Sequence, residues 1–278
     1  MQNIRVIFFG TPHFVVPVVE VLKEHFELVG VVTTPDEKVG RKQILTATPV
    51  AEYAVFQHIQ LLKPDKLTEE LIPSLKNLKP DLFIVAAYGK IVPQFILDIP
   101  KYGSLNIHPS LLPKYRGPAP LLTALLNGDK ESGITIMQMD AELDHGPIIS
   151  TAQFEILDID TSGSLIKRVF EQSAKMLVKI IPQYVNGELK PRPQNHDIAT
   201  YTNHITKQDG YFEITNPPTP ETLDRMIRAY YPWPNVWTKW EGKIVKFYPN
   251  NIVQIEGKKP VPLKEFLNGY PNFPLKLT

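Results

Sequence analysis

Three polar side chains near the middle of the chain have the types and spacing needed for acid–base chemistry. Asn106 and His108 are two residues apart in a run typical of a strand end, so both side chains point the same way. Pro109 ends that strand because it has no N–H to donate. Asp144 lies on a loop after a second apolar strand at 134–139. An amide donor, an imidazole and a carboxylate would together stabilise an anion and move protons near neutral pH.

These three residues also have a purely structural interpretation. Asn, His and Asp near strand ends are most often turn residues that bond to the local backbone. The neighbouring SLLP segment (residues 110–113) favours a ligand site instead, because it is too apolar for an exposed turn and is bounded by proline. An apolar loop beside polar groups suits a pocket for a flat, partly aromatic ligand.

Six stretches of the chain carry a resemblance to a known family. In chain order they are F-F-G-T-P-H-F, T-T-P-D-E-K-V-G-R-K, V-A-A-Y-G-K-I-V-P, N-I-H-P-S-L-L-P-K-Y-R-G-P-A-P, G-I-T-I-M-Q-M-D-A-E-L-D-H-G and R-A-Y-Y-P-W-P-N-V-W. Together they resemble the folate-dependent formyltransferases, and within that family the members that act on methionyl-tRNA. The similarity covers nearly the whole chain in the right order.

The resemblance implies a reaction and a set of residues for it. The formyl group of 10-formyltetrahydrofolate would pass to the free amino group of initiator methionyl-tRNA, for translation initiation, with no metal required. Asn106, His108 and Asp144 would be the catalytic trio. The residues expected to bind the folate are Tyr88, Gly89, Ser110, Leu111, Leu112, Pro113 and Asp140. From the residues alone, the stretch holding Tyr88 and Gly89 is equally typical of an ordinary turn after a strand.

The connection from 34 to 49 is long, and long connections are often functional. Its basic residues Lys38, Arg41 and Lys42 become candidates for contact with the tRNA acceptor end. The alternative is a solvated loop with incidental charge. Because the formal net charge of the chain is only +1, any contact with tRNA must come from such local patches.

Strand and helix patterns alternate regularly through the first part of the chain. Strands are expected at 4–9, 28–33, 59–62 and 81–87, with helices at 14–22, 49–57 and 68–78. This alternation predicts an α/β fold with a Rossmann-like parallel sheet and right-handed crossovers. The first strand runs into G-T-P-H-F, which is neither the dinucleotide fingerprint nor a P-loop, so NAD and ATP are disfavoured as ligands.

A Pro-rich polar stretch divides the chain. We expect a formyltransferase domain at 1–187, a linker at 188–203 and a smaller domain at 204–278. The resemblance implies an OB-like β domain there, and the chain leaves little room for its middle strands, so we predict a shortened, open barrel. Its aromatic cluster of Trp233, Trp237 and Trp240 is expected to form its core rather than a base-stacking platform.

Composition limits the other possibilities. The 278 residues are 43% hydrophobic and include no cysteine, which excludes thiolate catalysis, cysteine-ligated metals and disulfides. No apolar run is long enough to span a membrane, and the N-terminus is typical of a first strand rather than a signal peptide. We expect a cytoplasmic monomer.

Four rival functions remain open. A sugar-nucleotide N-formyltransferase would share the trio and the folate donor, and a formyltetrahydrofolate hydrolase would need no acceptor loop. A metal-dependent hydrolase could use His108, Asp140, Asp144 and His145. A non-catalytic folate-binding or RNA-binding module is the fourth.

Overall fold

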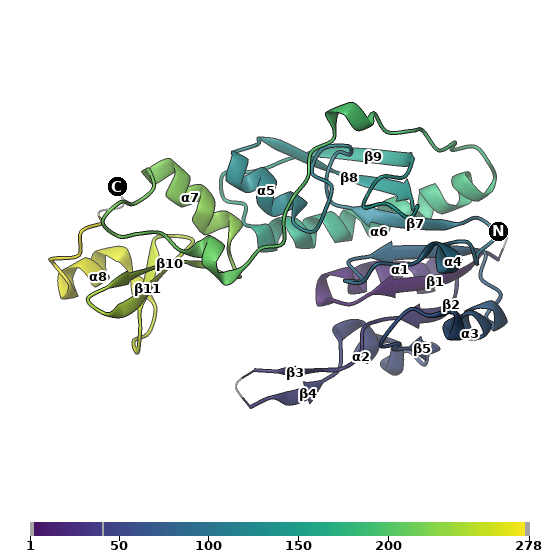
Figure 1. Cartoon of the computed structure of the whole chain (residues 1–278), viewed down its shortest axis with the longest axis horizontal. Helices are drawn as coiled ribbons and strands as arrows, with labels where there is room; N and C mark the ends of the chain where they lie inside the picture. Colours follow the sequence, from purple (N-terminus) through teal and green to yellow (C-terminus); the bar gives the residue numbers. More distant parts are fainter. Residues whose placement is uncertain (1–2, 41, 276–278) are drawn as a thin grey trace. The chain divides into compact units, whose positions relative to one another are not determined.

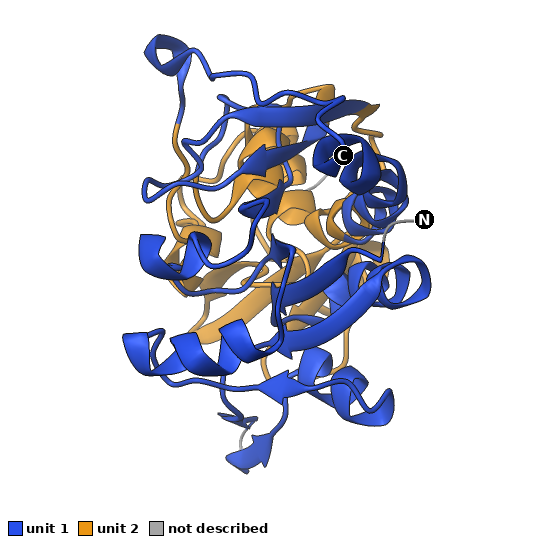
Figure 2. Ribbon diagram, turned by 90° about the vertical axis from the view of Figure 1, so that its right-hand side faces the viewer, with its two compact units in different colours: residues 1–116, 133–153, 167–200 blue, residues 117–132, 154–166, 201–278 orange. Residues whose placement is uncertain are grey.

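The computed structural model describes residues 3–40 and 42–275. By contact the chain forms two compact units, unit 1 with residues 1–116, 133–153 and 167–200, and unit 2 with residues 117–132, 154–166 and 201–278 (Figure 2). The predicted boundaries at 187 and 204 stay a prediction. The contact grouping differs from them because helix α5 (Pro120–Asn127) packs with helix α7 (Pro220–Ala229) inside unit 2.

A seven-stranded sheet, which lies mostly in unit 1, has the order β5-β2-β1-β6-β7-β8-β9 (Figure 1). Its strands are β1 Arg5–Gly10, β2 Glu27–Val32, β5 Leu61–Leu62, β6 Leu82–Ala86, β7 Ser104–His108, β8 Glu131–Gln138 and β9 Ile148–Glu155. Pairing is parallel from β5 to β7, and β8 then joins β7 in the antiparallel direction. The predicted Rossmann-like parallel sheet is confirmed, with an antiparallel extension at the β7 side.

Helices alternate with the parallel strands, as predicted. They are η1 His13–Val15, α1 Val16–His25, α2 Pro49–Phe56, η2 Glu69–Leu71, α3 Ile72–Asn77 and α4 Gln94–Leu97. Helices α6 Ser162–Val185 and η3 His196–Ile198 follow β9. Helix α2 begins sharply because the Thr48 hydroxyl accepts the Ala51 N–H at 3.1 Å and proline occupies the first helical position. The core includes Phe9 and Phe83 at 0% exposure, because these strands are covered on both faces.

The connection from 34 to 49 contains a two-stranded hairpin that the sequence pattern did not predict. Strands β3 (Glu37–Val39) and β4 (Ile44–Thr46) pair in the antiparallel direction, and all six of their residues are exposed. Such short exposed strands show no alternation of buried and polar residues, which is why the sequence indicated only a connection.

Unit 2 has a four-stranded antiparallel sheet in sequential order. Its strands and remaining helices are β10 Val236–Trp240, β11 Lys243–Tyr248, β12 Ile252–Ile255, β13 Val261–Pro262, η4 Lys207–Gly210 and α8 Leu263–Gly269. Helix α7 places Leu223 at 0% exposure in the same core as Val245 and Phe247. The predicted small antiparallel β domain is therefore present, and its strand order is that of an open sheet.

The prediction for the aromatic cluster is right for two of its members and wrong for the third. Trp237 is buried, and Trp240 packs its ring edge-on against Phe273 at 5.2 Å. Trp233 is 56% exposed. It lies between two prolines in the turn after α7, which carries its side chain away from the core. Within residues 3–40 and 42–275, no helix has the length and apolar character needed to cross a bilayer.

Candidate active site

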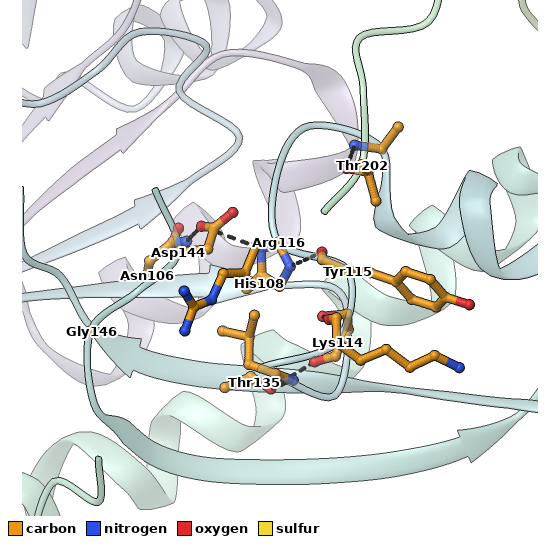
Figure 3. A network of polar contacts seen from close by, with 12 residues as sticks. Asn106, His108, Lys114, Tyr115, Arg116, Thr135, Asp144, Gly146 and Thr202 are labelled. Carbon is orange, nitrogen blue, oxygen red and sulfur yellow. Dashed lines mark hydrogen bonds and ion pairs between the residues drawn. The ribbon is translucent and has the colours of Figure 1, made fainter. Parts of the chain in front are cut away.

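Strand β7 presents Asn106 and His108 at its C-terminal end. Leu105 and Ile107 are buried at 0% and 2% exposure, Asn106 is half-buried and His108 is 3% exposed. The strand stops at His108, directly before Pro109. Both polar side chains reach toward Asp144 (Figure 3), as the alternation of a strand predicts.

Asp144 meets both of these side chains through one oxygen. Its Oδ1 lies 3.4 Å from Asn106 Nδ2 and 3.5 Å from His108 Nδ1. The Asp144 side chain is only 12% exposed, so its carboxylate depends on these donors and other protein groups in place of water. The three side chains that the sequence singled out thus converge on one point, from a strand end and from a loop 36 to 38 positions further along the chain.

The backbone fixes the tautomer of His108. Its Nε2 lies 2.9 Å from the carbonyl oxygen of Tyr115, which can only accept, so Nε2 carries a hydrogen and donates it. The exchangeable proton position is therefore Nδ1, the nitrogen that faces Asp144.

The SLLP segment is fixed from below by strand β8. The buried Thr135 hydroxyl donates to Ser110 O at 2.6 Å and accepts the Leu112 N–H at 3.1 Å. Ser110 is itself 0% exposed, and its hydroxyl donates to Lys114 O at 2.6 Å. Its side chain is therefore committed to the loop, while Leu111 and Pro113 are half-buried.

Gly133 makes room for this segment. A Cβ on Gly133 would lie 2.2 Å from Leu111 Cδ2 and 2.7 Å from the backbone oxygen of Ala152, so only glycine fits there. The close approach of β8 to Leu111 fixes how far the segment stands above the sheet.

Tyr88 and Gly89 follow β6, whose Val85 pairs with Asn106 on β7. Tyr88 is 2% exposed, and its hydroxyl has no hydrogen-bond partner within the described part of the chain. Burial raises the pKa of Tyr88 to about 12. Gly89 is exposed, with φ of +84°, a conformation that glycine adopts without strain.

Asp140 starts the loop that leads to Asp144. One of its carboxylate oxygens lies 2.7 Å from His145 Nδ1, and the other accepts the Glu142 N–H at 3.0 Å. Among residues 3–40 and 42–275, no three His, Asp or Glu side chains gather in a way that could hold a metal ion.

The basic residues proposed for tRNA contact lie on the β3–β4 hairpin. Lys38 is exposed on β3 and Lys42 is exposed in the turn, whereas Arg41 lies outside the described residues. The hairpin also exposes Val39, Ile44 and Leu45, each more than half. Its role in tRNA contact stays a prediction.

Sequence analysis missed a second group of residues around the Asp144 loop. Arg116 is 2% exposed and binds Gln194, which in turn binds the backbone of this loop. Gln194 lies in the stretch predicted to be a linker. A backbone pair holds that stretch to unit 1, because Ile148 and Arg192 exchange both backbone hydrogen bonds at 2.8 Å, and its role as a linker stays a prediction. The only signal in the sequence was the group of prolines around Gln194. Prolines stiffen an ordered segment that packs on a domain as readily as they stiffen a linker.

Known proteins resemble this chain over most of its length. A family model for formyl transferases matches residues 2–181, and a model for the formyl transferase C-terminal domain matches residues 204–254. The chain belongs to the formyltransferase family. A methionyl-tRNA formyltransferase of Chloroflexus aggregans is 41% identical over 244 residues, 87% of this chain and 78% of that protein. A methionyl-tRNA formyltransferase of Bacillus pumilus is 41% identical over 254 residues, 91% of this chain and 80% of that protein.

A solved structure shares the fold of this formyltransferase. The N-formyltransferase from Helicobacter canadensis, solved with folinic acid and dTDP-3-aminofucose, superposes with a TM-score of 0.65. It is 22% identical, and the match covers 91% of this chain and 95% of that one. At this identity the likeness concerns the fold alone.

Proposed function

We propose that this formyltransferase transfers the formyl group of 10-formyltetrahydrofolate to the amino group of initiator methionyl-tRNA. Its relatives named methionyl-tRNA formyltransferase, about 40% identical over some nine-tenths of the chain, support the acceptor. One observation carries the chemistry: Asn106 Nδ2 and His108 Nδ1 each lie within 3.5 Å of Asp144 Oδ1.

Formyl transfer needs an anion to be stabilised and a proton to be moved. The acceptor amine forms a bond to the formyl carbon, and the bond from that carbon to the folate nitrogen breaks. Negative charge grows on the formyl oxygen between these two events. One proton leaves the amine and one reaches the departing folate nitrogen, so no oxidant or reductant takes part.

Asn106 is the proposed donor to the formyl oxygen. Its Nδ2 carries two hydrogens, and the contact with Asp144 at 3.4 Å uses at most one of them. One preorganised donor at a developing oxyanion contributes about 3 kcal/mol of transition-state stabilisation. The buried His108 beside it adds positive charge to the same spot when Nδ1 is protonated.

His108 and Asp144 are the proposed proton carriers. Because Nε2 of His108 stays bonded to the Tyr115 carbonyl, the ring keeps its orientation while Nδ1 gains or loses its proton. Asp144 Oδ1 lies next to His108 Nδ1, and the Asp144 carboxylate accepts the proton that the amine releases. General acid–base catalysis of this kind contributes about 10² to 10⁴ in rate.

The residues of the site fit a folate. The half-buried Leu111 and Pro113 offer an apolar wall for a flat ring, and the Tyr88 hydroxyl is a buried polar atom that still has a hydrogen bond to offer. Gly89 has open space around it, since nothing lies within 4 Å of where its Cβ would be. The remaining proposed folate contacts are Ser110, Leu112 and Asp140, and the proposed tRNA contacts are Lys38, Arg41 and Lys42.

The deciding experiment measures acceptor choice. Labelled formyl is followed from 10-formyltetrahydrofolate to methionyl-tRNA, with dTDP-3-aminofucose as the rival acceptor because the Helicobacter canadensis structure contains it. We expect transfer to the tRNA and none to the sugar. Transfer to the sugar alone would make the chain a sugar N-formyltransferase, and release of formate without either acceptor would make it a hydrolase.

A further inference from the structure

A buried arginine and glutamine lie behind the Asp144 loop, outside the trio. Arg116 is 2% exposed, and a buried guanidinium is stable only when its N–H groups have acceptors. Its Nε and Nη2 donate to Gln194 Oε1 at 3.2 and 2.8 Å. Nη2 also donates to His196 Nδ1 at 2.7 Å. Arg116 thus orients the side chain of Gln194.

The carboxamide of Gln194 is used completely. Its oxygen accepts both Arg116 bonds, and its Nε2 donates to Asp144 O at 2.9 Å and to Gly146 O at 2.7 Å. A guanidinium only donates and a carbonyl only accepts, so the amide fits in one orientation alone. We call this set of four contacts the Gln194 bridge.

The two carbonyls held by the Gln194 bridge lie on either side of His145. The backbone from Asp144 to Gly146 is therefore held at two points. It is held in this way even though Asp144 has a φ of +48°, which is unusual for a residue with a side chain. Gly146 closes the loop against β8, where a Cβ would lie 2.0 Å from Gln138 O. The bridge and Gly146 together leave the loop one backbone path.

A second chain of contacts, made by side chains, connects Arg116 to the same loop. The His196 ring stacks on the His145 ring with centroids 4.0 Å apart and planes 6° from parallel. His145 Nδ1 in turn lies 2.7 Å from Asp140 Oδ2. Because the Arg116 guanidinium can only donate, His196 Nδ1 accepts this bond.

The contacts of Asp144 with Asn106 and His108 leave little tolerance for movement. The Asn106 contact, at 3.4 Å, is at the long end of hydrogen bonding, and the His108 contact, at 3.5 Å, is an ion pair, so an outward shift of a few tenths of an ångström removes the first and weakens the second. Resting on the proposed function, we propose that Gln194, oriented by Arg116, is a positioning residue that sets the place of the Asp144 carboxylate for proton transfer.

The test is the near-isosteric variant Gln194→Glu. It keeps the contact with Arg116 but replaces the donating NH₂ by an oxygen facing two carbonyl oxygens, at 2.9 and 2.7 Å in the native geometry. Arg116 keeps this carboxylate ionised, so it cannot donate to them. We expect kcat to fall about 10- to 100-fold, with KM for both substrates changed less than threefold, because misplacement of a reacting group lowers the rate more than binding. The pH dependence of kcat should also change, because the proposed proton-transfer groups no longer meet in the same place.

Gln183→Glu is the matched control, because Gln183 is exposed on α6 and undergoes the same change of charge. It should keep kcat within twofold. If Gln194→Glu, corrected for the folded fraction, also keeps kcat within twofold and an unchanged pH profile, Gln194 is only structural and the inference is wrong.

A measurement without substrates separates this inference from the proposed function. Amide hydrogen exchange of a peptide covering residues 140–147 should be faster in Gln194→Glu than in the wild type or in Gln183→Glu. Unchanged exchange would overturn the inference even if the wild type formylates methionyl-tRNA. Conversely, a wild type that fails to formylate methionyl-tRNA overturns the proposed function, while the exchange result still decides whether Gln194 holds the loop.

Discussion

Asn106→Asp is the substitution that most directly tests the proposed catalytic geometry. The side chain keeps its shape but exchanges a donating amide for an ionised oxygen. In the native geometry that oxygen would lie 3.4 Å from Asp144 Oδ1. Two unit charges at this distance repel by about 5 kcal/mol at an effective dielectric constant of about 20. The substitution therefore removes the donor to the formyl oxygen and also forces Asp144 away or into its protonated form.

Loss of the donor alone should lower kcat about 10²- to 10³-fold. Asn106→Ala isolates that loss, and because Asn106 is half-buried it should cost only about 1 kcal/mol of stability. Asn106→Asp should lose at least as much activity at neutral pH and regain part of it at lower pH, where the two carboxylates share a proton. The assay is single-turnover formyl transfer at saturating donor, beside a thermal melt of each variant.

Asn77→Asp serves as the control, because Asn77 is exposed at the end of α3 and its substitution should leave the rate unchanged. A folded Asn106→Asp enzyme with kcat within tenfold of the wild type at neutral pH would refute the assignment. It would mean that neither the amide donor nor the charge next to Asp144 matters to the slow step.

Three further substitutions test the surroundings of the site. Tyr88→Phe removes a buried hydroxyl with no partner in the described residues, so the free protein should gain about 1 kcal/mol in unfolding free energy while KM for the formyl donor rises. Since the pKa of Tyr88 rises from 10.0 to about 12, its folded state holds the proton more tightly, and stability falls from pH 10 to 12; Tyr88→Phe should flatten that fall in pH-dependent melts. Gly146→Ala places a methyl 2.0 Å from Gln138 O and should cost at least about 2 kcal/mol by urea unfolding, and an unchanged midpoint would contradict the tight loop. Thr135→Val removes both hydrogen bonds to the SLLP segment at constant shape and should cost about 1 to 3 kcal/mol with a raised donor KM, whereas Thr135→Ser should keep both.

The alternation of strands and helices in unit 1 was predictable because its central parallel strands, β1 and β6, are buried on both faces. Val6–Phe9 and Leu82–Ala86 are continuous apolar runs, and that pattern follows directly from burial. The antiparallel place of β8 beside β7 was not predictable, since the direction of a strand depends on the path of the connection and not on its own residues. The β3–β4 hairpin was missed for a related reason, because an exposed hairpin shows no burial pattern.

The candidate site divides in the same way. Asn106 and His108 are two residues apart on one strand. Because side chains in a strand alternate with a period of two, both lie on the same side whatever the rest of the chain does. Asp144 was a candidate from its place on a loop after a second apolar strand, and the resemblance supported it. Its meeting with Asn106 and His108 depends on how β8 returns alongside β7. Gln194 could not be found at all from spacing, because it comes from an unrelated stretch 50 positions beyond Asp144.

By itself, the sequence determined the kind of fold, the family and the pair of polar groups at the end of β7, because periodicity and local motifs are properties of neighbouring residues. Only the tertiary structure decided which nitrogen of His108 faces the site and which groups hold the Asp144 loop. Both depend on backbone carbonyls, of Tyr115 in one case and of Asp144 and Gly146 in the other. Every residue has such a carbonyl, so its presence carries no information in the sequence, and only the folded chain shows which one lies within reach of a donor.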